Sequence, residues 1–197
     1  PIAEEADFAV IGVPFDTGAT FRVGARFGPE AIRSNSVLLK PYNIALDIDI
    51  FDYCSGYDYG DLPIVPGFIE DSYEKIEKNL LPLLDKGIIP VLLGGDHSIT
   101  LAELRAVAKK HGPVALIQFD SHTDTMDSYF GRRYNHGTPF RRAVEEGLLD
   151  PEHSIQVGIR GSVYAKDDLK ASKELGLEMV TAVEIQQIGI PVIIQRI

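Results

Sequence analysis

The sequence has 197 residues, a net charge of −10 and a single cysteine, and these three values already exclude several classes of protein. A chain of this length can bury its own core, and Cys54 has no second thiol to pair with, so no disulfide framework is expected. The excess of 29 acidic over 19 basic residues disfavours binding to nucleic acid or to an anionic membrane surface, and it favours a cationic ligand.

Neither a membrane span nor a secretory leader is predicted. No apolar run approaches the roughly 18 residues that a membrane-spanning helix needs. Residues 1–5 include two glutamates, whereas a leader would begin with basic residues. We therefore expect a soluble, cytoplasmic protein.

The first half of the chain predicts buried strands and amphipathic helices in alternation. The apolar run Phe8–Phe15 predicts a strand, and Gly28-Pro29 predicts the start of a helix, because proline suits the first turn. Asp47–Tyr53 predicts a strand at a sheet edge, since it carries three aspartates. Ile69–Lys86 has the three- and four-residue apolar spacing of a helix, and Ile88–Leu93 predicts the next buried strand.

The second half continues the alternation of helices and strands. Helices are predicted over Ile99–Lys110, Thr138–Leu149 and Tyr164–Leu175, and buried strands over Val114–Phe119 and Ser154–Ile159. Short joints between such elements are typical of an α/β protein with a mostly parallel, doubly wound sheet and helices on both faces. We expect one such domain over residues 1–197. In this fold class, ligands bind beyond the carboxyl ends of the strands.

The strongest chemical signal is the segment Asp120-Ser121-His122-Thr123-Asp124, directly after a predicted strand. An extended backbone would direct Asp120, His122 and Asp124 to one side, where a divalent cation would offset the repulsion between the two carboxylates. His97, which follows Gly94-Gly95 at the end of the preceding strand, can supply a second imidazole. Such a donor set suits Mn²⁺ better than Zn²⁺ or Fe²⁺.

A structural interpretation of the same segment also exists. Asp120 then ends a strand, Asp124 caps a turn and His122 is a polar loop residue; the placement of His97 at the neighbouring strand end favours the metal site. His136 precedes a predicted helix, where it either shuttles a proton or is an ordinary loop histidine. Gly12–Gly28 lacks the spacing of a phosphate loop and is interpreted as a long loop near the site or at a subunit contact.

At these residues the chain resembles the ureohydrolase family, the arginases and agmatinases. Five segments carry the resemblance, in order and over nearly the whole chain: Gly24–Arg33, Gly94–Ser98, Phe119–Asp124, His136-Gly137 and Val157–Ser162. The resemblance implies a three-layer α/β/α sandwich, and it implies a homo-oligomer.

The resemblance also implies a reaction and the residues that perform it. Family members hold two Mn²⁺ ions, whose bridging hydroxide attacks a guanidinium carbon and releases urea and an amine. His97, Asp120, His122 and Asp124 match the family's metal ligands, and His136 matches its catalytic histidine. The implied enzyme is a hydrolase of linear amidine C–N bonds.

The segment Ile159–Ser162 resembles agmatinases, so agmatine, which would give putrescine for polyamine biosynthesis, is the first expected substrate. Guanidinobutyrate and related guanidino acids come next. Thr125–Arg133 is expected to belong to the specificity loop.

Two departures from the family pattern stand out. Ser121 replaces the usual alanine, and no Ser-x-Asp-x-Asp motif or later substrate-binding glutamate follows Arg160. Gly189–Ile197 resembles the helix that precedes that motif, so we expect that the C-terminal part is missing and that the 197 residues alone are inactive. A short, non-catalytic metal-binding or oligomer-forming relative is the alternative; a mononuclear Zn²⁺ deacetylase fits less well, because Asp124 belongs to the two-metal pattern.

Overall fold

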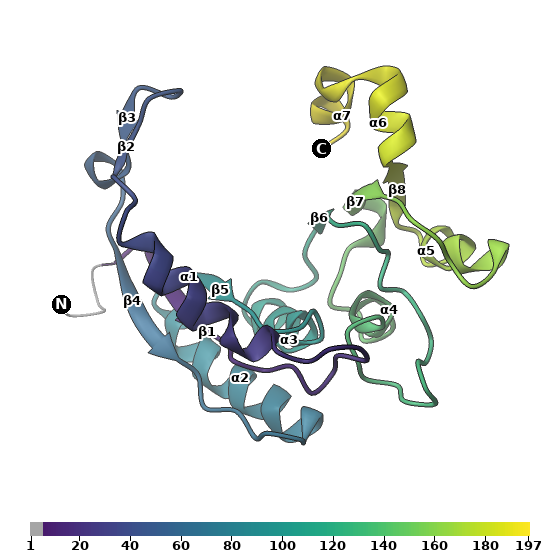
Figure 1. Ribbon diagram of the computed structural model, residues 1–197, viewed down its shortest axis with the longest axis horizontal. Helices are drawn as coiled ribbons and strands as arrows, with labels where there is room; N and C mark the ends of the chain where they lie inside the picture. The colour runs from purple at the N-terminus through teal and green to yellow at the C-terminus, as the bar shows by residue number, and fades with distance from the viewer. Residues whose placement is uncertain (1–5) are drawn as a thin grey trace. The chain divides into compact units, whose positions relative to one another are not determined.

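The computed structural model describes residues 6–197, and the chain divides into two compact units, Pro1–Ala106 and Val107–Ile197 (Figure 1). The acidic residues 1–5, on which the expectation about a leader depends, lie outside the described part. Each unit is built around its own parallel sheet. The α/β class with mostly parallel strands is therefore confirmed. The expectation of a single domain stays a prediction.

The first unit has the strand order β4-β1-β5, with all pairs parallel. The strands are β1 (Phe8–Gly12), β4 (Gly56–Asp61) and β5 (Ile89–Leu93). Helix α2 (Ile69–Asp85) connects β4 to β5 and buries a stripe of apolar side chains at helical spacing, Tyr73, Ile76, Leu80, Leu83 and Leu84. Helix α1 (Gly28–Ser36) begins with proline in its first turn, as predicted.

The strand predicted over Asp47–Tyr53 is mostly wrong. Only Ile48–Asp49 (β3) is a strand, and it pairs antiparallel with β2 (Tyr42–Asn43) in a hairpin. The side chain of Asp49 accepts a hydrogen bond from the backbone N–H of Phe51 at 2.9 Å and caps a 3-10 helix over Ile50–Asp52. The aspartate that suggested an edge strand thus ends it.

The second unit has the parallel strand order β6-β7-β8. Its strands are β6 (Ile117–Phe119), β7 (Ile155–Ile159) and β8 (Glu178–Thr181). Its helices are α4 (Pro139–Glu145), α5 (Lys170–Glu174), α6 (Ala182–Ile188) and α7 (Ile190–Arg196), and a 3-10 turn over Lys166–Leu169 precedes α5. Helix α3 (Ile99–His111) contains the boundary between the two units.

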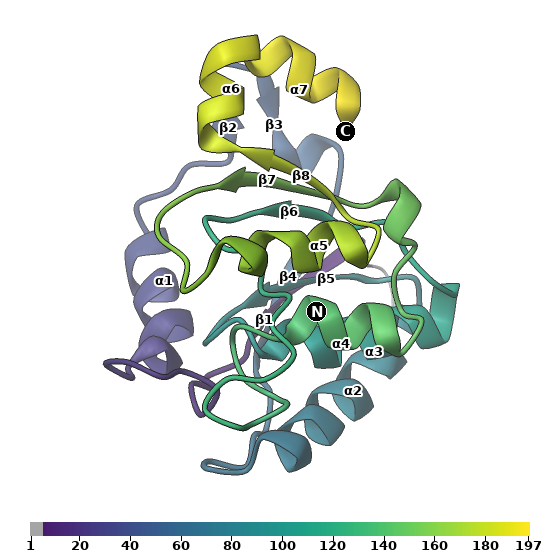
Figure 2. The same ribbon diagram turned by 90° about the vertical axis from the view of Figure 1, so that its right-hand side faces the viewer.

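Helices cover both faces of the second sheet. Ile155 and Val157 of β7 pack with Val180 of β8 and Ile193 of α7 in a buried cluster. Gln156, between them, points to the opposite face because strand side chains alternate, and it bonds Ser172 of α5. Figure 2 shows α5 on one side of β7 and β8 and the α6–α7 pair on the other. No helix in the part of the chain that the structure describes is long and apolar enough to cross a membrane.

Candidate metal centre and its loops

The first two residues after β6, Asp120 and Ser121, are hydrogen-bonded to β7 and to the residue that follows it. The backbone N–H of Asp120 donates to the carbonyl of Val157 at 3.1 Å, and the N–H of Arg160 donates to the carbonyl of Ser121 at 2.9 Å. The segment therefore leaves the carboxyl end of the sheet at a defined point. This is the position at which parallel α/β sheets bind ligands.

Asp120 and Asp124 approach each other in this segment. Each offers a carboxylate oxygen, and these oxygens lie within 4.8 Å of one another. Asp124 is buried, with 8% of its surface exposed, and the side chain of Asp120 is 20% exposed. Two carboxylates held this close at low exposure favour a divalent cation between them.

The backbone of this segment is not extended, in contrast to the expectation. The N–H of His122 turns back and donates to Oδ1 of Asp120 at 2.9 Å, and Asp124 adopts a left-handed conformation with φ 49°. The turn, and not strand alternation, brings the two carboxylates together. Aspartate tolerates this backbone region better than most residues.

The ring of His122 lies outside the carboxylate pair. Its side chain is 69% exposed, and Nδ1 lies 3.8 Å from Oδ1 of Asp120 and 3.2 Å from the hydroxyl of Ser121. The assignment of His122 as a metal ligand stays a prediction.

His97 lies in the first unit, in the turn between β5 and α3. The preceding Gly95 has φ 84°, and a Cβ at this position would lie 2.6 and 2.7 Å from two backbone oxygens, so only glycine fits. The N–H of Asp96 donates to the carbonyl of Phe15 at 2.8 Å, and Oδ1 of Asp96 accepts from the N–H of Ser98 at 2.8 Å. Burial raises the pKa of Glu103 in α3 to about 7, although the nearby His97 opposes this shift.

His136 is half-buried in a tight turn that begins α4. The side-chain oxygen of Asn135 accepts from the N–H of Gly137 at 2.9 Å, and the N–H of Met126 donates to the carbonyl of Gly137 at 3.0 Å. The ring of Tyr129 meets the imidazole edge to face, with 5.8 Å between ring centroids. The turn and the aromatic ring together restrict the imidazole to one region of the loop.

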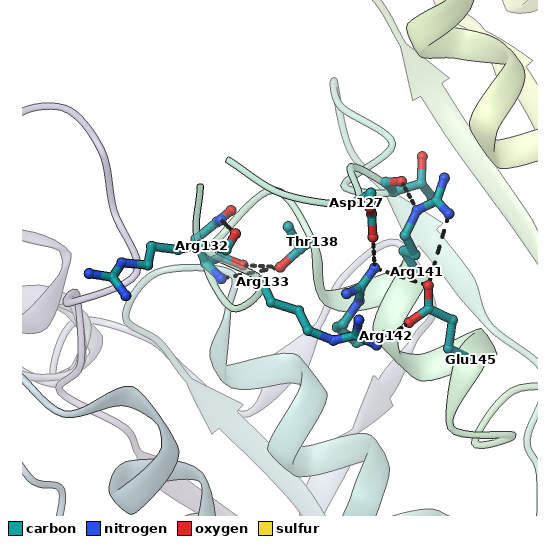
Figure 3. A network of polar contacts seen from close by, with 9 residues as sticks. Asp127, Arg132, Arg133, Thr138, Arg141, Arg142 and Glu145 are labelled. Carbon is teal, nitrogen blue, oxygen red and sulfur yellow. Dashed lines mark hydrogen bonds and ion pairs between the residues drawn. The ribbon is translucent and has the colours of Figure 1, made fainter. Parts of the chain in front are cut away.

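The expected specificity loop, Thr125–Arg133, is tied to α4 by arginines (Figure 3). Arg142 is fully buried and donates from Nη2 to Asp127 at 2.6 Å and to Glu145 at 3.0 Å. Arg133 also bonds Glu145, at 2.6 Å. The hydrogen bond from Arg142 lowers the pKa of Asp127 below its ordinary value.

The loop Gly12–Gly28 is closed by an internal ion pair. Buried Asp16 pairs with Arg26 and accepts from the N–H of Gly24 at 2.8 Å, and the hydrogen bond from Arg26 lowers the pKa of Asp16. The sequence interpretation as a loop and not a phosphate-binding turn agrees with this pairing. Its expected place near the site or at a subunit contact stays a prediction.

The sequence interpretation missed three buried polar side chains under the carboxylate segment, Gln118, Gln156 and Ser172. Gln118 and Gln156 lie inside strands that were recognised as buried apolar runs. A glutamine within such a run was the available signal, because a buried amide needs hydrogen-bond partners.

Comparisons with known proteins give a consistent result. Residues 6–197 match the sequence model of the arginase family. Over 182 residues, which is 92% of the chain, the sequence is 46% identical to a protein named "Agmatinase, mitochondrial" from Gallus gallus and covers 54% of it. It is 44% identical to a guanidinobutyrase from Pseudomonas aeruginosa, with 90% of the chain and 56% of that protein covered.

A solved structure agrees at the level of the fold. A formiminoglutamase from Trypanosoma cruzi, described as a structure with Mn²⁺, matches 97% of the chain with a TM-score of 0.85 and 27% identity. The chain covers 65% of that protein. Our chain thus spans between about half and two thirds of the length of each of these relatives.

Proposed function

Because the chain belongs to the arginase family, we propose that the full-length protein hydrolyses a small guanidino compound with the help of Mn²⁺. Its first substrate is agmatine, which takes up water and yields putrescine and urea. The observation that carries the proposal is the close pair of Asp120 and Asp124 at the carboxyl end of β6. Relatives named agmatinase and guanidinobutyrase, at 46% and 44% identity, support the substrate class.

The donor set fits the proposed metal. His97, Asp120, His122 and Asp124 would hold it, and a mixture of carboxylate and imidazole without thiolate suits Mn²⁺. Two ions need further ligands, and since the chain spans about half of its agmatinase relative, the remainder of a longer protein is the source we propose. When bound, such ions lower the pKa of water enough for attack at neutral pH.

His136 is the proposed proton carrier. The reaction breaks the bond between the guanidinium carbon and the alkyl nitrogen, and the departing amine must gain a proton. A half-buried imidazole in a fixed turn can deliver that proton, because histidine is the side chain that most often acts as a general acid in enzymes. The net charge of −10 would attract the cationic substrate.

A guanidino-acid hydrolase is the second candidate. It is favoured by the guanidinobutyrase relative, whose identity to the chain is nearly that of the agmatinase. Both substrates carry a guanidinium, and they differ at the far end, where agmatine has an amine and guanidinobutyrate a carboxylate. The loop Thr125–Arg133, which includes two arginines, is the segment that we propose distinguishes these ends.

We further propose a cytoplasmic homo-oligomer that binds neither nucleic acid nor membranes. The word "mitochondrial" in the name of the Gallus gallus relative applies to that protein. Size-exclusion chromatography with light scattering tests the oligomer.

Urea release by the full-length protein, measured with and without Mn²⁺ on agmatine, guanidinobutyrate and arginine, tests the function. We expect Mn²⁺-dependent urea from agmatine, and loss of at least about 100-fold in kcat/KM for Asp124→Asn and for His136→Ala, since the first removes the charge of a proposed metal ligand and the second removes the proposed proton carrier. The exposed Asp167→Asn is the matched control and should keep full activity.

Two outcomes would redirect the proposal. Faster urea release from guanidinobutyrate than from agmatine would favour the second candidate. A native gene product of about 21.7 kDa that binds metal without hydrolysing any guanidine would indicate a non-catalytic relative.

A further inference from the structure

Three buried polar side chains form a continuous hydrogen-bonded chain beneath the carboxylate segment. Ser172 of α5 donates from its hydroxyl to Oε1 of Gln156 at 2.5 Å. Gln156 of β7 donates from Nε2 to Oε1 of Gln118 at 2.5 Å. Gln118 of β6 donates from Nε2 to Oδ2 of Asp120 at 3.2 Å. The chain therefore runs from a helix, through two neighbouring strands, to a carboxylate.

Both amides use every hydrogen that they carry. The second hydrogen of Gln156 Nε2 goes to the backbone carbonyl of Thr123 at 2.6 Å, and that of Gln118 Nε2 goes to the backbone carbonyl of His122 at 3.1 Å. An amide has two donors, and both donors of both glutamines are thus occupied. Each amide oxygen also accepts one bond, from Ser172 in one case and from Gln156 in the other.

This pattern permits only one orientation of each amide. If the oxygen and nitrogen of Gln118 were exchanged, its oxygen would face the carboxylate of Asp120 and the carbonyl of His122, both of which are acceptors. The same exchange in Gln156 would oppose its oxygen to the carbonyl of Thr123. Burial makes such a mismatch costly, since Gln118 is 5% exposed and Gln156 and Ser172 are fully buried.

The hydrogen-bonded chain of Ser172, Gln156 and Gln118 restrains both the backbone of the carboxylate segment and the side chain of Asp120. The carbonyl of His122 accepts a hydrogen bond from Gln118, and the carbonyl of Thr123 accepts one from Gln156. The N–H of His122 donates to Asp120. The carboxylate of Asp120 receives Gln118 on one oxygen and His122 on the other. Besides Asp120 itself, the turn that brings Asp120 near Asp124 is therefore held by Gln118 and Gln156, which are not candidate ligands.

We propose that Gln156, acting with Ser172 and through Gln118, is a positioning residue that presets the Asp120–Asp124 turn for a divalent cation. This proposal rests on the proposed function, because it gives the turn a metal-binding role. Outer groups that orient metal ligands commonly change metal affinity about 10- to 100-fold when they are altered.

Two variants of the full-length protein test the chain. Gln156→Met removes both donors and the acceptor with little change in volume, and Ser172→Ala removes only the first donor. The matched control is Val180→Ala in the apolar cluster on the opposite face of the same sheet, where a fully buried residue loses packing but no hydrogen bond. All three are compared with the wild type by thermal melting, by hydrogen exchange without metal, and by calorimetric titration with MnCl₂.

Gln156→Met should accelerate amide exchange at residues 121–125 at least about 10-fold in the metal-free protein and weaken Mn²⁺ binding about 10- to 100-fold. Ser172→Ala should give smaller changes in the same directions and remains informative if Gln156→Met does not fold. Val180→Ala should lower the melting temperature and leave Mn²⁺ affinity within about twofold, because it destabilises the unit without touching the turn.

The positioning role is overturned if either glutamine-chain variant keeps wild-type exchange at residues 121–125, or if Val180→Ala weakens Mn²⁺ binding as much as Gln156→Met does. The exchange measurement needs neither metal nor substrate. A protein that releases no urea would therefore contradict the proposed function, but the exchange experiment would still show whether Gln156 presets the turn.

Discussion

Replacing Asp124 with asparagine should stabilise the metal-free protein. The carboxylate oxygens of Asp120 and Asp124 lie within 4.8 Å of each other. Two unit charges at that distance repel by about 1 kcal/mol in water and by about 3.5 kcal/mol at an effective dielectric constant of about 20. Because Asp124 is buried and Asp120 is partly exposed, we expect the gain in free energy of unfolding to be about 1–3 kcal/mol.

Asparagine isolates the effect of charge. Asp124 has φ 49°, a backbone region that asparagine and aspartate tolerate alike, whereas alanine would add backbone strain. Asparagine also keeps one side-chain oxygen as an acceptor. Asp167→Asn removes the same charge from an exposed position and should change stability by less than about 0.5 kcal/mol.

Addition of Mn²⁺ should reverse the order of stability. A ligand that binds only the folded state at 1,000 times its Kd adds about 4.1 kcal/mol, which for a chain of this size raises the melting temperature by roughly 8–16 °C. Wild type should gain this stabilisation and Asp124→Asn should gain little. The assay is thermal or urea unfolding with EDTA and then with excess MnCl₂. Lower stability of Asp124→Asn in EDTA, or an undiminished Mn²⁺ shift, would refute the electrostatic reasoning.

Three further changes have expected outcomes in unfolding and exchange experiments. Gly95→Ala should lower the free energy of unfolding by more than about 3 kcal/mol, because its Cβ would lie 2.6 Å from a backbone oxygen, while Gly87→Ala, which has φ 77° and open space, should cost about 1 kcal/mol. Asp127→Asn should speed hydrogen exchange in the Thr125–Arg133 loop, because it removes the ion pair with Arg142. Since Arg142 lowers the pKa of Asp127, the wild-type protection should persist above about pH 4 and disappear as the pH falls through the lowered pKa of Asp127. Burial raises the pKa of Glu103 to about 7, so the metal-free fold should lose up to about 3 kcal/mol as pH rises from about 4.5 to 7, and Glu103→Gln should abolish that slope in urea unfolding.

The elements that the sequence predicted best are those with a continuous apolar run or a long apolar stripe. Helix α2 ends one residue before the predicted boundary, and β5 begins one residue after it. Strand β4 (Gly56–Asp61) was missed because glycine, tyrosine and aspartate alternate along it without an apolar run. Its place in the sheet depends on pairing with β1, which is a tertiary contact that no local pattern reveals.

Helix α6 was missed although a local signal was present. Thr181 accepts a hydrogen bond from the N–H of Glu184 at 3.1 Å, and a threonine three residues before a glutamate is a typical helix start. The neighbouring α7 lies within the stretch Gly189–Ile197, which resemblance had suggested to be helical. The missed helix thus reflects an unused capping signal and not a conflict between sequence and fold.

The close pair of Asp120 and Asp124 lies in the segment that the sequence singled out, but the geometry of that segment was not predicted. The spacing of Asp120, His122 and Asp124 marked them as possible ligands, but only Asp120 and Asp124 approach each other in this segment, and strand alternation is not the reason. The hydrogen bond from the N–H of His122 to Asp120 and the left-handed backbone of Asp124 bring the two carboxylates together instead. Two glutamines also bond this segment, Gln118 and Gln156, and they lie 38 residues apart in the sequence, so their pairing could not be read from the local pattern.

The ring of His122 lies outside the carboxylate pair, whereas the backbone of this residue is part of the turn that holds the pair together. Its N–H is bound to Asp120 and its carbonyl to Gln118, so the backbone of this residue is held at both ends. The side chain is 69% exposed, and therefore few packing contacts oppose its rotation. Exposed side chains change between staggered χ rotamers within nanoseconds. If His122 is a metal ligand, we therefore expect its ring to change rotamer on Mn²⁺ binding while amide exchange at residues 121–125 shows that the backbone of the turn stays in place.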